Sequence, residues 1–166
     1  MTYIRLTKKL QNYVHNVDTS FTSQTITATS KSNNTSFNSS EVVYTPASNA
    51  SNVVYEISFQ IAPSPDYYHS LMSFRLEYSD NDGSTWTDLT STQALIGSSQ
   101  QTNPTESAWH IYTFKVILDV WSGERKIRAN GPCWATSTQY TLGSSFNASD
   151  STGVGSCPHV SIYSIM

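Results

Sequence analysis

The stretch Val-Val-Tyr-Glu-Ile-Ser-Phe-Gln-Ile at residues 53–61 carries the clearest fold signal in the chain. Apolar side chains occupy every second position from Val53 to Ile61, and mostly polar side chains lie between them. Successive side chains of a strand point to opposite faces of a sheet, so this alternation predicts a strand with one buried and one wetter face.

Two further stretches, residues 72–79 and 112–120, show the same period of two and predict two more strands. The second of them also has apolar residues on its other face, namely Ile111, Ile117 and Trp121. A strand that is apolar on both faces is covered on both sides. We therefore expect a neighbour against the outer face of this strand, and a symmetric partner is the simplest one.

The rest of the chain predicts short strands separated by turns and no helix of ten residues or more after residue 20. A length of 166 residues suggests one domain. Closely spaced short strands with polar turns are typical of a β-sandwich or barrel, so the predicted fold class is all-β. The remaining strands are expected at residues 24–29, 41–44, 86–89, 126–130, 134–142 and 160–165, with polar loops at 95–103 and 143–156.

Residues 1–19 differ from the rest of the chain in the spacing of their apolar side chains. These recur at intervals that favour one face of a helix, at Leu6, Leu10, Tyr13, Val14 and Val17. We interpret residues 1–19 as a short N-terminal helix or docking arm and residues 20–166 as the sandwich. The alternative is a first strand that covers the sandwich.

Composition and charge exclude several classes of partner. Charged residues make up 13% of the chain and the net charge is −3, with no basic tract to attract nucleic acid. No apolar run reaches the length needed to span a membrane. If Met1 is the native start, the absence of a secretory signal predicts synthesis and folding in a cytosol. Cys133 and Cys157 are then expected as buried thiols, although a disulfide between them stays open.

Residues that support catalysis or metal binding do not form a recognisable pattern. The four histidines have no spacing typical of a metal site. No Gly-x-Ser-x-Gly motif occurs, and most acidic residues fall in predicted turns or on wet strand faces. We therefore expect no enzyme activity, no cofactor and no metal. The histidines are His15, His69, His110 and His159.

One local motif is specific. The run Ser-Asp-Asn-Asp-Gly-Ser-Thr-Trp from Ser79 to Trp86 resembles the Asp-box turn of sialidases and other β proteins. It predicts a hairpin turn in which Gly83 adopts a positive φ and Trp86 packs beneath the loop. Calcium binding by Asp80 and Asp82 is a lesser alternative.

The C-terminal run Cys-Pro-His-Val-Ser-Ile-Tyr-Ser-Ile-Met at residues 157–166 resembles the closing strand of TNF-like jelly rolls found in virion proteins of tailed phages, notably cyanophages. Residues 44–48, 53–59, 110–118 and 126–128 are similar to other strands of these proteins, in the same order. The resemblance spans about residues 40–166 and implies an antiparallel TNF-like jelly-roll β-sandwich.

The resemblance also implies a homotrimer, with inner-sheet aromatic residues near the three-fold axis, and on this chain the candidates are Tyr55, Tyr112 and Tyr163. The function expected is a structural protein of the virion, assembled in the host cytoplasm. It is a trimeric decoration or cement protein that binds the major capsid protein through the apolar residues of segment 1–19. The alternative is a carbohydrate-binding tip of a tail or head fibre, whose loops would present Tyr67, Tyr68 and Trp109.

Overall fold

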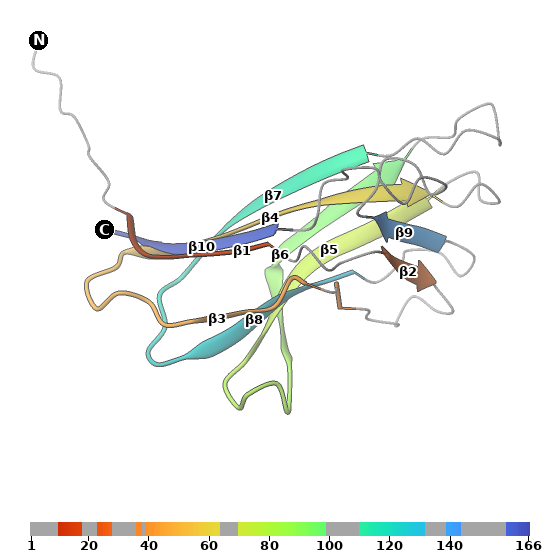
Figure 1. The fold of residues 1–166 in the computed structure, drawn as a ribbon. Helices are drawn as coiled ribbons and strands as arrows, with labels where there is room; N and C mark the ends of the chain where they lie inside the picture. The colour runs from red at the N-terminus through yellow and green to blue at the C-terminus, as the bar shows by residue number, and fades with distance from the viewer. Residues whose placement is uncertain are drawn as a thin grey trace, which may run out of the picture.

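The computed structural model of the chain forms two antiparallel β-sheets that pack face to face (Figure 1). It describes residues 10–17, 23–27, 36–37, 39–63, 70–98, 110–131, 139–143 and 159–166. These residues form ten strands: β1 (Leu10–Val17), β2 (Ser23–Thr27), β3 (Val42–Tyr44), β4 (Asn52–Pro63), β5 (Ser70–Ser79), β6 (Thr87–Ser98), β7 (His110–Leu118), β8 (Arg125–Asn130), β9 (Gln139–Gly143) and β10 (His159–Ile165).

Strand β4, which contains the stretch at residues 53–61, lies in the middle of the larger sheet. We call this sheet A; its order is β1-β10-β4-β9-β2, and β7 also pairs with β4. The smaller sheet B has the order β3-β8-β5-β6. The pairings follow a jelly-roll pattern, in which most neighbours in a sheet are distant in sequence. The predicted all-β sandwich is therefore confirmed.

The inner faces of the two sheets meet in one apolar core. The inward positions of β4 hold Tyr55, Ile57 and Phe59, each at most 1% exposed, as the alternation predicted. Aromatic rings join the two sheets: Phe74 of β5 stacks on Phe114 of β7 with ring centroids 4.3 Å apart. Phe59 stacks on the same Phe114 ring at 5.8 Å. The core thus depends on aromatic contacts between sheet A and sheet B.

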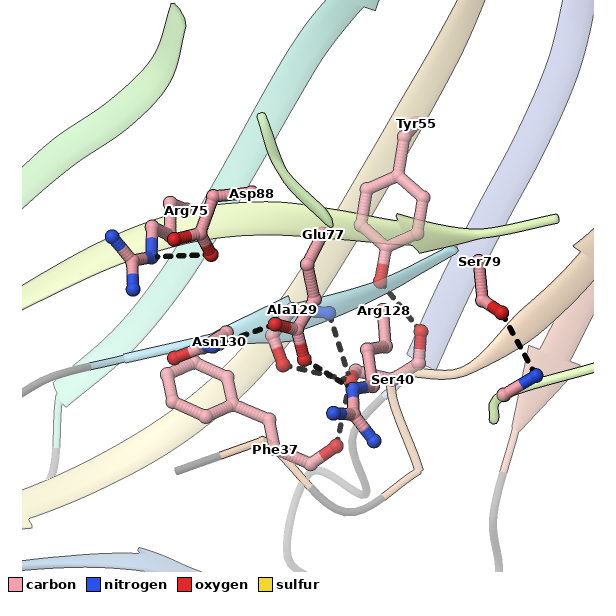
Figure 2. Close-up of polar contacts among 11 residues, drawn as sticks. Phe37, Ser40, Tyr55, Arg75, Glu77, Ser79, Asp88, Arg128, Ala129 and Asn130 are labelled. Atoms are coloured by element: carbon pink, nitrogen blue, oxygen red, sulfur yellow. Dashed lines mark hydrogen bonds and ion pairs between the residues drawn. The ribbon is translucent and has the colours of Figure 1, made fainter. Parts of the chain in front are cut away.

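The segment before β3 closes one side of this core (Figure 2). Phe37 packs its ring on Phe59 with centroids 5.1 Å apart, and its backbone N–H donates to the carbonyl of Ala129 at 2.9 Å. The buried Ser40 hydroxyl donates to the Phe37 carbonyl at 2.6 Å and accepts from the Ala129 N–H at 3.0 Å. The Tyr55 hydroxyl donates to the Ser40 carbonyl at 2.6 Å. Burial raises the pKa of this hydroxyl, which therefore stays protonated and remains a donor.

The Asp-box turn adopts the predicted hairpin between β5 and β6. Gly83 has a φ of 87° and Asp82 a φ of 58°. The Ser79 hydroxyl accepts from the Gly83 N–H at 2.9 Å, and Asn81 Oδ1 accepts from the Thr85 N–H at 2.9 Å. The calcium alternative finds no support here, because Asp80 pairs with Arg125 at 2.6 Å and Asp82 pairs with Lys126 at 2.8 Å.

The helix predicted near the N-terminus is wrong over residues 10–17, which form β1 at the edge of sheet A. The alternative of a first strand is correct. A β-bulge explains the misleading spacing: the register shifts between Gln11 and Val14, and Asn12 has a φ of 50°. The extra residue moves the two-residue alternation by one position, which makes a strand resemble a helical stripe. Residues 1–9, including Leu6, lie outside the described residues.

The loop predicted at residues 95–103 is also wrong in its first part. Strand β6 continues to Ser98 and pairs with β5 as far as Ser70. Mixed apolar and small residues on this edge strand conceal its alternation. The Cys133 and Cys157 thiols and the candidate glycan-binding residues Tyr67, Tyr68 and Trp109 lie outside the described part of the chain.

We predict that Phe74→Ala lowers the free energy of unfolding by about 3–5 kcal/mol, because it leaves a cavity between the two sheets. Urea unfolding followed by circular dichroism measures the change. The matched control is Val43→Ala, an exposed apolar residue on the outer face of sheet B, which is expected to change stability by less than about 0.5 kcal/mol. Equal effects of the two changes would contradict this account of the core.

We predict that Tyr55→Phe costs about 1–3 kcal/mol, although it keeps the ring, because the buried Ser40 carbonyl loses its donor. The same urea titration measures it. Tyr13→Phe is the control: the Tyr13 ring is largely exposed and its hydroxyl meets a hydroxyl. A Tyr55→Phe protein as stable as the wild type would show that the Tyr55–Ser40 hydrogen bond adds little.

Candidate binding surface

The outer face of sheet A carries a row of apolar side chains that the strand registers align. Tyr163 of β10 lies opposite Val54 of β4, and Val54 lies opposite Ile117 of β7. The Tyr13 ring of β1 stacks on the Tyr163 ring with centroids 5.9 Å apart. We call these four residues the apolar row.

The two ends of the apolar row are exposed, whereas its middle is covered. Tyr13 is 57% and Ile117 is 66% exposed, but Val54 is fully buried. Ile111, on the same face of β7, is 59% exposed. Five large apolar side chains are exposed among the described residues, and three of them, Tyr13, Ile111 and Ile117, lie on the outer face of sheet A. Exposed apolar residues that gather on one face mark an interaction site more often than scattered ones do.

A row of polar side chains runs beside the apolar row. His15 of β1 lies opposite Ser161 of β10, which lies opposite Glu56 of β4 and then Lys115 of β7. His15 Nδ1 and Ser161 Oγ are 2.8 Å apart, and Lys115 Nζ lies 3.2 Å from Glu56 Oε2. The Lys115 ammonium also lies 5.7 Å from the Tyr163 ring centroid. Side-chain contacts raise the pKa of Lys115; the contact with Tyr163 has the largest effect and the contact with Glu56 the next largest.

The Ser161–His15 contact lacks the other parts of a hydrolytic site. Ser161 lies in the middle of β10, whose backbone pairs with β1 on one side and with β4 on the other. An oxyanion hole needs free N–H groups that converge on one point, and a strand paired on both sides does not provide them. Among the described residues no acidic side chain contacts His15 to orient it, so this geometry favours binding over acyl transfer.

The described residues also show neither a metal cluster nor a membrane span. The His15 and His159 rings have centroids 5.8 Å apart, yet no group of three or more His, Cys, Asp or Glu residues is placed to hold a metal within the described ranges. No helix in the described part of the chain has the length and apolar character to cross a membrane.

The outer face of sheet B differs because its charges are paired with one another (Figure 2). Arg128 forms a short ion pair with Glu77, whose other oxygen accepts from Asn130 Nδ2 at 2.9 Å. Arg75 Nε lies 3.2 Å from Asp88 Oδ1. The two groups form an ion pair, but their geometry does not meet that of a hydrogen bond. This face contains one exposed large apolar side chain among the described residues, Val43 at 43%. Sheet A therefore offers the better candidate surface.

The structure separates the three tyrosines predicted for a trimer interface. Tyr55 is fully buried inside the protomer, so it has no surface with which to contact a partner, and its predicted interface role is replaced by the bond to Ser40. Tyr112 is half-buried and packs its ring against Phe59 on the inner face. Tyr163 alone lies on the outer face, at the centre of the apolar row.

The residues predicted for docking are also divided. Tyr13 points outward and stacks on Tyr163, whereas Val14 packs against the core. The side chains of Leu10 and Val17 are not described. The polar row was missed in the sequence because His15, Ser161 and Glu56 become neighbours only through strand register. Ile111 and Ile117 did give a signal, as apolar residues out of phase with their strand.

Comparison with known proteins supports the fold. No family model matches the sequence, and no curated protein does. Among solved structures, Eiger TNF from S. frugiperda matches with a TM-score of 0.53 at 12% identity, over 93% of this chain and 92% of that chain. The chain has a TNF-like jelly-roll fold. A second structure, TmCBM61 in complex with β-1,4-galactotriose, covers 93% of this chain and 88% of its own at 12% identity, but its TM-score of 0.25 is too low to carry an argument.

Proposed function

We propose that this jelly roll is a non-enzymatic structural and binding module that assembles into a homotrimer through the outer face of sheet A. The observation that carries the proposal is the apolar row, with Tyr13 exposed at one end and Ile117 exposed at the other. Covering these side chains and Ile111 removes apolar surface from water, which is the main driving force of protein association.

The position of the exposed residues favours a cyclic assembly. Tyr13 lies on β1 at one edge of sheet A, while Ile117 lies on β7, beyond β10 and β4. The two ends of the row are chemically different, an aromatic ring and a branched aliphatic side chain. A contact between two unlike surfaces is heterologous and forms a ring when the rotation closes. Three-fold closure is what the resemblance to TNF-like jelly rolls implies.

The proposed setting is a phage virion, where the trimer decorates the capsid and binds the major capsid protein. The sequence resemblance to phage jelly-roll proteins supports this setting. The docking element we propose is residues 1–9, since residues 10–17 belong to sheet A. The alternative is a carbohydrate-binding tip of a tail or head fibre. A cavity at the end of β7, lined by Trp121 and Arg125 among others, favours it.

We predict that the purified chain has three times its mass of 18.4 kDa in solution and that Tyr13→Ser combined with Ile117→Ser makes it a monomer. Each buried aromatic or aliphatic anchor contributes about 1–2 kcal/mol or more to such an interface. Sedimentation velocity measures the mass. The control, Val43→Ser, removes a similarly exposed apolar side chain from sheet B. A monomeric wild type, or dissociation by Val43→Ser, would overturn the proposal.

We predict that deletion of residues 1–9 leaves the fold and the trimer intact but abolishes binding to capsids. The deletion ends before β1, so sheet A keeps its edge strand. Co-sedimentation with capsids that lack the protein measures binding. The Tyr13→Ser and Ile117→Ser protein tests separately whether trimer formation is needed. Normal capsid binding by the shortened chain would contradict the docking role.

A further inference from the structure

A cavity of about 370 Å³ opens at the end of β7, between the two sheets. This volume lies within the range of small-molecule sites, roughly 300–1,000 Å³. Its wall combines aliphatic and aromatic side chains with one cation and one carboxylate. We call it the β7-end pocket; its lining is Tyr78, Leu89, Ile117, Leu118, Asp119, Val120, Trp121, Arg125 and Ile127.

The topology explains why the sandwich is open at this place. In the described part of the chain β6 is an edge strand of sheet B, and β7 pairs only with β4 in sheet A. None of the ten described strands pairs across the space between these two edges. Core residues therefore reach the pocket floor, where Ile127 is 1% and Leu118 is 8% exposed.

Arg125 places hydrogen-bond donors in the pocket wall. Its guanidinium lies 4.3 Å from the Tyr78 ring centroid and 5.5 Å from the Trp121 ring centroid, so cation–π contacts hold it at the aromatic wall. Its Nε binds Asp80 at 2.6 Å. The two terminal nitrogens have no hydrogen-bond partner among the described residues, so they remain available to a ligand.

Two further groups add an acceptor and a donor. The Asp119 carboxylate is exposed and forms no ion pair or hydrogen bond with the described residues. The Trp121 indole Nε1 is buried and has no partner among them. A ligand hydroxyl that reaches the indole edge would satisfy a donor that the fold leaves unpaired. The pocket thus presents donors and an acceptor beside an apolar wall.

Charge and polarity narrow the class of ligand. An anion would meet Arg125 but also the carboxylates of Asp119 and Asp80, so a negative charge gains little. A purely apolar ligand would remove Arg125 and Asp119 from water without replacing their hydrogen bonds, which is costly. A neutral molecule with several hydroxyl groups and a C–H face fits both parts of the wall. We propose that the β7-end pocket binds a neutral saccharide.

This site differs from the loops in which a glycan site was predicted from the sequence. It is built from strand ends and from residues 119–121, which follow β7 directly in the chain. It does not rest on the homotrimer or on the virion setting. The pocket and the apolar row share Ile117, so binding should be measured in both the wild type and the Tyr13→Ser protein, which keeps every residue of the pocket lining.

The test is an NMR titration of the full chain with D-galactose, D-glucose, D-mannose and N-acetyl-D-glucosamine, each raised to tens of millimolar, where weak sites become occupied. We expect at least one sugar to cause saturable shifts in the backbone amides of residues 117–121 and 125. No saturable shift with any of the four sugars would overturn the proposal. Phenylacetate is the anionic probe, and its binding in place of the sugars would also overturn it.

Two matched variants locate the site. Asp119→Ala removes the acceptor in the pocket, and Glu124→Ala removes the same charge from an exposed residue of the same loop outside the lining. We expect Asp119→Ala to weaken binding about tenfold or more, as the loss of one hydrogen bond to a charged group does, and Glu124→Ala to leave it unchanged. Equal effects of the two variants would show that the sugar binds elsewhere.

Discussion

The register of β4 with its two neighbours is the constraint on which the rest of the structure depends. The antiparallel ladders align β10, β4 and β7 residue by residue, so the alternation of β4 becomes a property of the whole sheet. The inward positions of β4 from Val53 to Phe59 then join the core, and the outward positions Val54 and Glu56 join rows that cross the sheet. A slip of one residue would exchange Tyr55 for Val54 and place polar side chains between the sheets.

The two outer faces differ in chemistry: the face of sheet B carries paired charges, whereas the face of sheet A carries exposed apolar side chains. On sheet B, Glu77 is 5% exposed, and its negative charge is compensated by Arg128 and Asn130. Exposed ion pairs elsewhere on that face contribute little to stability, but they keep the face well solvated. On sheet A the polar row pairs within itself, while the apolar row ends in exposed side chains at Tyr13 and Ile117. Among the described residues, the face of sheet A therefore gains more from a partner than the face of sheet B does.

Strand β7 links the proposed assembly surface to the β7-end pocket. Ile117 takes part in the apolar row and also lines the pocket, and the chain then turns through Trp121 to bring Arg125 against Tyr78. A partner on sheet A and a ligand in the pocket would therefore lie next to each other. The pocket floor is formed by the core residues Leu118 and Ile127, whereas the stacked rings of Phe74 and Phe114 are not part of the pocket lining.

Local sequence was sufficient for the all-β class, for the strands around residues 53–61, 72–79 and 112–120, and for the Asp-box turn. Alternation and turn chemistry act between near neighbours, so they can be read without knowing the fold. The same reasoning failed at residues 10–17, because a bulge shifts the alternation, and at Tyr55, because an apolar strand position does not reveal whether it faces the core or a partner. Tertiary structure alone brought His15, Ser161, Glu56 and Lys115 into one row and opened a pocket between β6 and β7. Both features depend on which strands pair, in which register, and which edges stay uncovered, and these depend on contacts between residues far apart in the chain.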